Sequence, residues 1–235
     1  YANPFDMLSL ATDSSPDLAD FLLRCLGPTN VGLIFLYLDA TTPGNALRPD
    51  SGRTYVACYW TLKEYPSFFR NRASIGWFTL GLFHQQDMKD FGFSESELAK
   101  ELLRCFWNDA PQSHNFSSTG MRVRRSSGEM VHIRMAFGGF LNDAKGHSDI
   151  LGHNGASAMK PCLSCLNVLG RVSMESVRPD GYFCHVKDWN CSRCVLATVN
   201  DYTEIVRLLR EAHATGDARA MKDITKQTGI KYEPR

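Results

Sequence analysis

An uninterrupted apolar run, Val31–Leu38, is the feature that most restricts how this chain can fold. It leads to Asp39 and then to the segment 40–45, whose Pro43 and Gly44 favour a turn. A short apolar run closed by proline and glycine is typical of a strand buried on both faces at the centre of a mixed sheet. Because the sheet would hold the strand's end rigidly while the loop opens to solvent, Asp39 is a candidate functional carboxylate.

The composition is that of an ordinary globular protein and excludes few functions. Of the 235 residues, 43% are hydrophobic and 22% are charged, which suits one large domain or a domain with a small appendage. The net charge of +1 lowers the expectation of nucleic-acid binding but does not exclude it, since catalytic acids offset basic residues. We expect no membrane span and no signal peptide, because no apolar run is long enough and no basic-then-apolar leader follows Tyr1.

Local patterns predict an alternation of strands and helices. Ser94 and Glu97 form a capping-box sequence, which marks the start of a helix that ends near Asn108. Residues 111–128 are rich in turn-forming and polar types and are expected to be a loop. The other expected elements are a helix over 17–26, strands over 53–62, 73–83 and 130–141, a short helix or turn over 144–151, and helices over 201–212 and 217–228.

A second acid follows the predicted strand 130–141, in the pair Asn142-Asp143. If this strand and the strand 31–38 are neighbours in one sheet, Asp39 and Asp143 come together. Two close carboxylates raise each other's pKa unless a cation lies between them. Hard oxygen ligands favour Mg²⁺ or Mn²⁺, and a pair of such ions can cleave a phosphodiester. Asp39 and Asp143 are therefore candidate metal-binding and catalytic residues.

The eight cysteines are concentrated towards the end of the chain. Five lie between positions 162 and 194, and four of these form two Cys-x-x-Cys pairs, Cys162 with Cys165 and Cys191 with Cys194. Without a secretory leader, this spacing favours a metal site over disulfides. We expect structural Zn²⁺ on the four paired cysteines, with Cys184 and His185 as competing ligands. His147 and His153 are expected at the surface or beside a metal site, not as ligands.

Two groups of arginines are candidates for contact with a nucleic-acid backbone. Arg70 and Arg72 lie between predicted strands, and Arg122, Arg124 and Arg125 lie in the predicted loop. Lysine and arginine neutralise phosphates, but a short basic cluster is also common at a solvated hairpin tip. Both interpretations remain open from the sequence.

The order of elements, with an acid on the first strand and another just after the fourth, resembles the ribonuclease H-like fold of DDE/D transposases. In transposases of the CACTA kind the second acid is followed at a short interval by a Cys-x-x-Cys pair, as Asp143 is here by Cys162 and Cys165. The segment Asp39-Ala40-Thr41-Thr42-Pro43-Gly44-Asn45 also resembles the first motif of transposase-like proteins of protists. The resemblance covers residues 31–170.

This resemblance implies an α/β protein: a ribonuclease H-like mixed sheet flanked by helices, with a small zinc-binding appendage and a C-terminal helical segment. The expected divisions are a helical lead-in at 1–30, the core at 31–158, the cysteine-rich segment at 159–199 and the start of an insertion at 200–235. The implied function is two-metal-ion DNA strand cleavage and strand transfer, with Mg²⁺ or Mn²⁺ and Zn²⁺. Transposon ends and target DNA would be its partners, in the nucleus, with homo-oligomers possible.

The chain departs from that family's pattern in its third acid. These enzymes complete the metal site with an acid on a later helix, whereas Asp201, Glu204 and Glu211 lie on what reads as an ordinary amphipathic helix. The resemblance then implies an incomplete catalytic core, with the third acid beyond Arg235 or lost. The alternative is a non-catalytic, zinc-stabilised binding or scaffolding module derived from a transposase.

Overall fold

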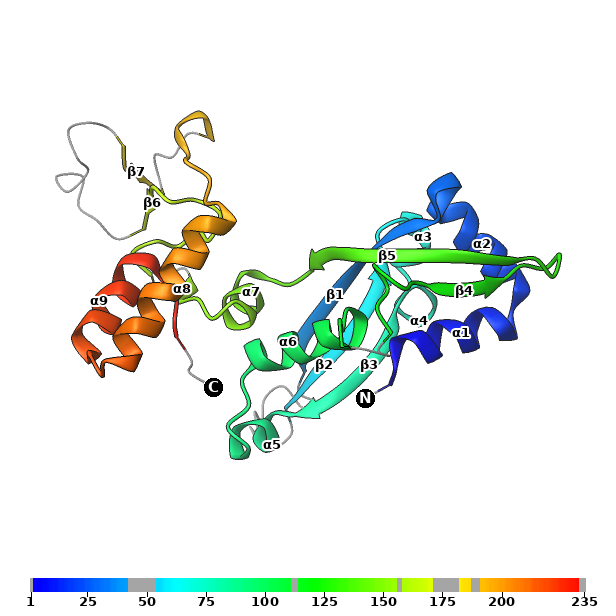
Figure 1. Ribbon diagram of the computed structural model, residues 1–235, viewed down its shortest axis with the longest axis horizontal. Helices are drawn as coiled ribbons and strands as arrows, with labels where there is room; N and C mark the ends of the chain where they lie inside the picture. Colours follow the sequence, from blue (N-terminus) through cyan, green and yellow to red (C-terminus); the bar gives the residue numbers. More distant parts are fainter. Residues whose placement is uncertain are drawn as a thin grey trace, which may run out of the picture. The chain divides into compact units, whose positions relative to one another are not determined.

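The computed structural model describes residues 2–41, 54–110, 114–155, 158–170, 182–186 and 191–232 (Figure 1). The chain divides into two compact units, Tyr1–Asn142 and Asp143–Arg235. The turn residues Pro43, Gly44 and Asn45 lie outside the described ranges. No helix among the described residues is long and apolar enough to cross a membrane.

The first unit is built on a mixed five-stranded sheet with helices beside it, an α/β arrangement as expected (Figure 1). The strand order is β3-β2-β1-β5-β4; β1 pairs in parallel with β5, and the other pairs are antiparallel. The elements are α1 (Pro4–Ser14), α2 (Pro16–Leu26), η1 (Gly27–Thr29), β1 (Val31–Thr41), β2 (Tyr55–Leu62), α3 (Ser67–Arg70), α4 (Ala73–Gly76), β3 (Phe78–His84), α5 (Gln85–Asp90), α6 (Glu95–Phe106), β4 (Met121–Arg124) and β5 (Met130–Phe140).

Strand β1 lies at the centre of this sheet, but it is not buried on both faces as expected. Ile34, Leu36 and Leu38 are almost fully buried, whereas Phe35 and Tyr37 between them are only half-buried. Side chains alternate between the two faces of a strand, and only one face of β1 packs against the main hydrophobic core. The strand also extends beyond Leu38 to Thr41, into the segment expected to form a turn, and Asp39 pairs with Ala57 of β2 inside the ladder.

Helices cover the core face of the sheet. Phe106 of α6 meets Trp60 of β2 edge to face, with ring centroids 5.5 Å apart. A Cβ atom added to Gly32 of β1 would lie 2.6 Å from Leu26 of α2, so glycine permits this close approach. The capping box of Ser94 and Glu97 at the start of α6 is confirmed, with both reciprocal hydrogen bonds present. Helix α1 was not predicted.

Two further sequence predictions are wrong in the first unit. The predicted strand 73–83 begins only at Phe78, because residues 73–76 form the short helix α4. The predicted loop 111–128 contains a strand, β4, which pairs antiparallel with β5 at the edge of the sheet. Its four residues include two exposed arginines, so the local pattern alone does not distinguish it from a polar loop.

The second unit is small and mostly helical. Its elements are α7 (Ala144–Ile150), β6 (Val168–Leu169), β7 (Cys184–His185), η5 (Cys191–Arg193), α8 (Val199–Ala214) and α9 (Ala218–Thr228). Helix α8 starts at Val199, before the predicted start at residue 201, because Thr198 is its N-cap. Gly229 ends α9 with φ at +79°, a left-handed conformation that favours glycine.

His153 is buried beside the end of α9, so of the two environments expected for it, a surface position or a position beside a metal site, the surface position is wrong. Its side chain is 2% exposed, and Nδ1 accepts a hydrogen bond from the Gly155 amide at 2.9 Å. The backbone around it pairs with the end of α9, since the Asn154 amide donates to the Gly229 carbonyl. His153 is therefore part of the packing of the second unit.

Candidate metal sites and nucleic-acid interface

The first candidate site lies at the carboxyl-terminal ends of β1 and β5. These strands are parallel neighbours, with Leu36 opposite Phe140. This pairing is the condition under which the sequence analysis expects Asp39 and Asp143 to come together. The backbone pairing continues past the strand, since the Leu141 amide donates to the Leu36 carbonyl at 2.8 Å. The side-chain amide of Asn142 then donates to the carbonyl of Leu38, the residue before Asp39.

Two oxygen-bearing side chains, those of Asp39 and Asn142, belong to this edge. Asp39 is exposed, and its carboxylate accepts one hydrogen bond, from the Tyr37 hydroxyl at 2.9 Å. The side-chain oxygen of Asn142 is buried and has no hydrogen-bond partner among the described residues. An unpaired buried carbonyl oxygen is costly, and a bound cation or water is the usual explanation. The sequence analysis did not assign Asn142 this role.

Asp143, the next residue in the chain, is the N-cap of α7. Its Oδ1 accepts from the Gly146 amide at 2.6 Å, and its side chain is exposed. A carboxylate that caps a helix with one oxygen can still offer the other to a ligand. The role of Asp143 as a helix cap therefore does not prevent it from also binding a metal ion.

The second candidate site is a group of thiols in the second unit. The segment 164–166 pairs with 195–197 through hydrogen bonds such as that from the Leu166 amide to the Val195 carbonyl, at 2.8 Å. This pairing brings Cys194 to Cys165, which also contacts Cys162. Burial and, secondly, these two thiols raise the pKa of Cys165 to about 12. The described residues, which exclude the side chain of Cys191, contain no group of three or more His, Cys, Asp or Glu arranged to hold a metal ion.

Asn167 organises the backbone around the thiols. Its side chain is 1% exposed and donates to the carbonyls of Tyr182 and Arg193, while its oxygen accepts from the Val195 amide. The thiol of Cys184, the competing ligand, lies 3.8 Å from the Asn167 side-chain nitrogen. Cys184 therefore packs against Asn167, whereas Cys162 and Cys194 contact Cys165.

The acids of α8 are engaged in local interactions. Hydrogen bonds from Thr198 lower the pKa of Asp201, which closes the capping box of the helix. The guanidinium of Arg207 binds Glu204 and Glu211 on the same exposed face and lowers the pKa of Glu204. All three acids behave as ordinary surface residues of a helix, as expected from the sequence.

The predicted DNA-contacting arginines fall into different environments. Arg122 and Arg124 are exposed on β4, not in a loop. Arg125 is bound by Asp20 of α2 at 3.2 Å and by Glu129 at 3.4 Å. Arg72 is exposed, but Arg70 is half-buried, and its Nε is buried without a hydrogen-bond partner in the described part of the chain. Of the five arginines, Arg122, Arg124 and Arg72 are therefore the most accessible to a nucleic-acid ligand.

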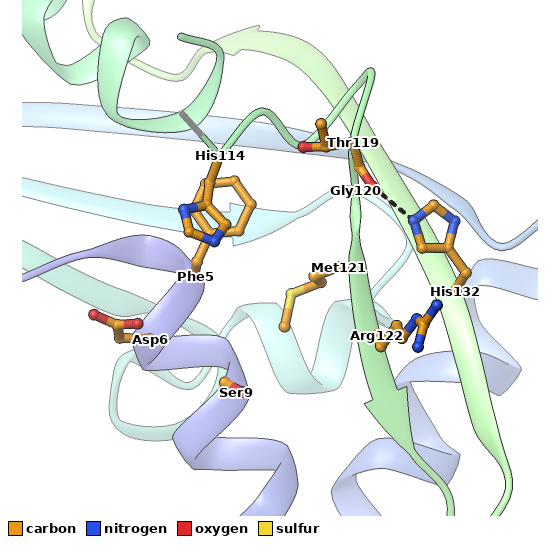
Figure 2. Close-up of a pocket in the computed structure, with 9 residues that line it drawn as sticks. All are labelled: Phe5, Asp6, Ser9, His114, Thr119, Gly120, Met121, Arg122 and His132. Atoms are coloured by element: carbon orange, nitrogen blue, oxygen red, sulfur yellow. Dashed lines mark hydrogen bonds between the residues drawn. The ribbon is translucent and has the colours of Figure 1, made fainter. Parts of the chain in front are cut away.

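A cavity of about 460 Å³ lies beside β4 in the first unit (Figure 2). Phe5 forms part of its wall and stacks on Phe116 behind it, with ring centroids 3.8 Å apart. Arg122 and His132 lie together on one side of β4, across from the α1 residues Asp6 and Ser9 (Figure 2). The sequence analysis did not single out this cavity, because its lining comes from three separate segments: 5–9, 114–122 and residue 132.

No protein-family model matches this chain, and no curated protein matches it. Its function is therefore inferred from the residues and contacts described above.

Proposed function

We propose that this chain is a transposase-type core for metal-dependent cleavage and strand transfer of DNA, built on a ribonuclease H-like sheet. The observation that carries the proposal is the parallel pairing of β1 and β5, because the resemblance requires the acid-bearing first and fourth predicted strands to be neighbours. The link from Asn142 to Leu38 extends that pairing to the residues that precede the two acids.

The residues present suit a divalent metal. Asp39 and Asp143 would supply carboxylate oxygens to Mg²⁺ or Mn²⁺, and the unpaired oxygen of Asn142 could add a neutral ligand. When bound, such ions activate a water or hydroxyl and stabilise the leaving oxygen of a phosphodiester. The protein's part is to hold the oxygens in place: β1 holds Asp39 within the ladder, and the Tyr37 hydroxyl orients its carboxylate.

We further propose a structural Zn²⁺ site in the second unit, on Cys162, Cys165, Cys191 and Cys194. The contacts of Cys165 with two other thiols support this site. Neighbouring thiolates repel each other, and a zinc ion bound between them would compensate their negative charge. Such a site would be structural, because the metal would link the segment that carries Cys162 and Cys165 to the segment that carries Cys191 and Cys194.

The test is calorimetric binding of Mn²⁺ to the purified chain. Asp39→Asn and Asp143→Asn each remove one charged ligand and keep the side-chain shape, so each is expected to weaken binding about tenfold or more. Asp90→Asn, an exposed acid at the end of α5, is the matched control and should bind as the unmodified chain does. Equal Mn²⁺ affinity in all four proteins would contradict the catalytic proposal.

The thiol contacts also favour a second candidate, a zinc-stabilised binding module without catalysis. This function predicts that Asp39→Asn and Asp143→Asn change neither metal content nor DNA binding, whereas loss of Cys165 unfolds the second unit. Mn²⁺ binding by the two aspartate variants therefore separates the two functions, whereas zinc content and far-ultraviolet circular dichroism of a Cys165 variant test the zinc site that both functions share.

A further inference from the structure

One face of the β4–β5 ladder carries a row of exposed arginines and a histidine. Arg122 lies directly opposite His132, and Arg124 lies opposite Met130. Val123, Ile133 and Met135 are buried, so the residues that alternate with them are on the other face. Arg122, Arg124, His132 and Arg134 are all exposed there. We call these four residues the basic face.

The guanidinium groups of the basic face have no acidic partners in the part of the chain that the structure describes. Among the described residues, Arg122, Arg124 and Arg134 form no ion pair, and the nearby acids Asp20 and Glu129 both bind Arg125 instead. Asp6 and Asp13 line cavities with Arg122 and Arg124 but are not within ion-pair distance of them. Like charges on neighbouring positions of a ladder destabilise it, so this uncompensated row suits a polyanionic ligand.

His132 is held in a fixed orientation on this face. Its Nε2 donates to the Thr119 carbonyl at 2.7 Å (Figure 2), which leaves Nδ1 as the ring's other polar atom. This contact depends on Gly120, where φ is +59° and an added Cβ would lie 2.8 Å from the His132 ring nitrogen. The cavity beside β4, bordered by Arg122, His132 and the Ser9 segment of α1, extends the polar surface beyond the strands.

We propose that the basic face binds the phosphodiester backbone of DNA. The inference rests on the proposed function for the identity of the polyanion, and it adds Arg134 and His132 to the contact surface while removing Arg125. Residues two apart on a strand are about 6.7 Å from each other along it, so Arg122 and Arg124 present separate cations to successive points of a backbone. Such contacts release counterions and do not read sequence.

The test is fluorescence anisotropy with a short labelled DNA duplex and with its single strand, at several salt concentrations and with EDTA present. The triple variant Arg122→Gln, Arg124→Gln, Arg134→Gln is expected to lose about 100-fold in affinity at ~0.1 M salt. The slope of log affinity against log salt should become shallower by about 2 to 3. Loss on either DNA form supports the inference and identifies the form that is bound.

The matched control is Lys89→Gln with Lys100→Gln, two exposed cations on α5 and α6. This double variant should bind DNA with nearly the affinity of the unmodified chain, once the change in net charge is taken into account. An equal loss in this control, an unchanged triple variant, or tighter binding to anionic phosphatidylserine vesicles than to DNA would each overturn the inference. Because EDTA removes divalent ions, Asp39→Asn should bind DNA normally in this assay, so failure of the metal site and failure of the basic face are distinguishable.

Discussion

The side-chain amide of Asn142 donates a hydrogen bond to the backbone carbonyl of Leu38, a residue 104 positions earlier in the chain. The bond joins the segment that leaves β5 to the end of β1, beyond the last backbone pair of the two strands. It connects the residues that immediately precede Asp39 and Asp143. Local sequence patterns cannot report such a contact.

Asn142→Ala is expected to lower the free energy of unfolding of the first unit by about 1 kcal/mol, because a part-buried carbonyl loses its donor. It should also weaken Mn²⁺ binding if the unpaired Asn142 oxygen is a ligand. Urea unfolding and calorimetry measure the two effects. Asn71→Ala, at an exposed position after α3, should change neither; unchanged stability in Asn142→Ala would show that the contact contributes nothing.

Gly229→Ala should destabilise the second unit more than Gly216→Ala. Both glycines have positive φ, at +79° and +69°, so each substitution costs roughly 1 kcal/mol in backbone strain. A Cβ at Gly229 would also lie 2.3 Å from Nε2 of the buried His153, whereas nothing lies within 4 Å of one at Gly216. We expect an additional cost of about 1–3 kcal/mol from this overpacking. Thermal unfolding of the two variants gives the comparison, and equal midpoints would contradict the described packing of α9.

The stability of the second unit should fall as the pH drops below about 6.5. Burial lowers the pKa of His153 beneath its ordinary value of 6.5. In that range the unfolded chain takes up a proton that the folded chain does not, so protonation favours unfolding. The contribution is complete above pH 6.5 and is lost progressively at lower pH.

The measurement is the unfolding midpoint between pH 7.5 and 5.5 for the unmodified chain and for His153→Asn, which keeps an acceptor for the Gly155 amide but does not titrate. The difference between the two proteins should shrink or reverse as the pH falls. A pH-independent difference would mean that His153 binds its proton equally well in both states.

Zinc content should distinguish among the cysteines. Cys165→Ala and Cys194→Ala are expected to lose zinc, because these thiols contact each other. Cys184→Ala should keep it, because Cys184 is buried against Asn167. Metal released after thiol modification is the readout. Loss of zinc in Cys184→Ala to the same extent as in Cys165→Ala would assign the fourth ligand position to Cys184 instead of Cys191.

Elements that depend on short-range chemistry were predictable from the sequence. The apolar run 31–38, the strand-forming pattern of 130–141, the Ser94 capping box and the Gly229 helix end are set by propensity and by hydrogen bonds within a few residues. The candidate acids and the cysteine pairs were also identifiable, because spacing carries that information. These predictions needed no knowledge of which segments meet.

Features that require contacts between distant segments became visible only in the folded chain. The fold made β1 and β5 parallel neighbours, turned a predicted loop into the edge strand β4, and buried His153 beneath α9. It also separated arginines that look alike in the sequence, since Asp20, on a helix far away in the chain, neutralises Arg125 but not Arg122. Strand pairing, burial and charge neutralisation depend on which surfaces the whole fold brings together, and single-sequence patterns do not contain that long-range information.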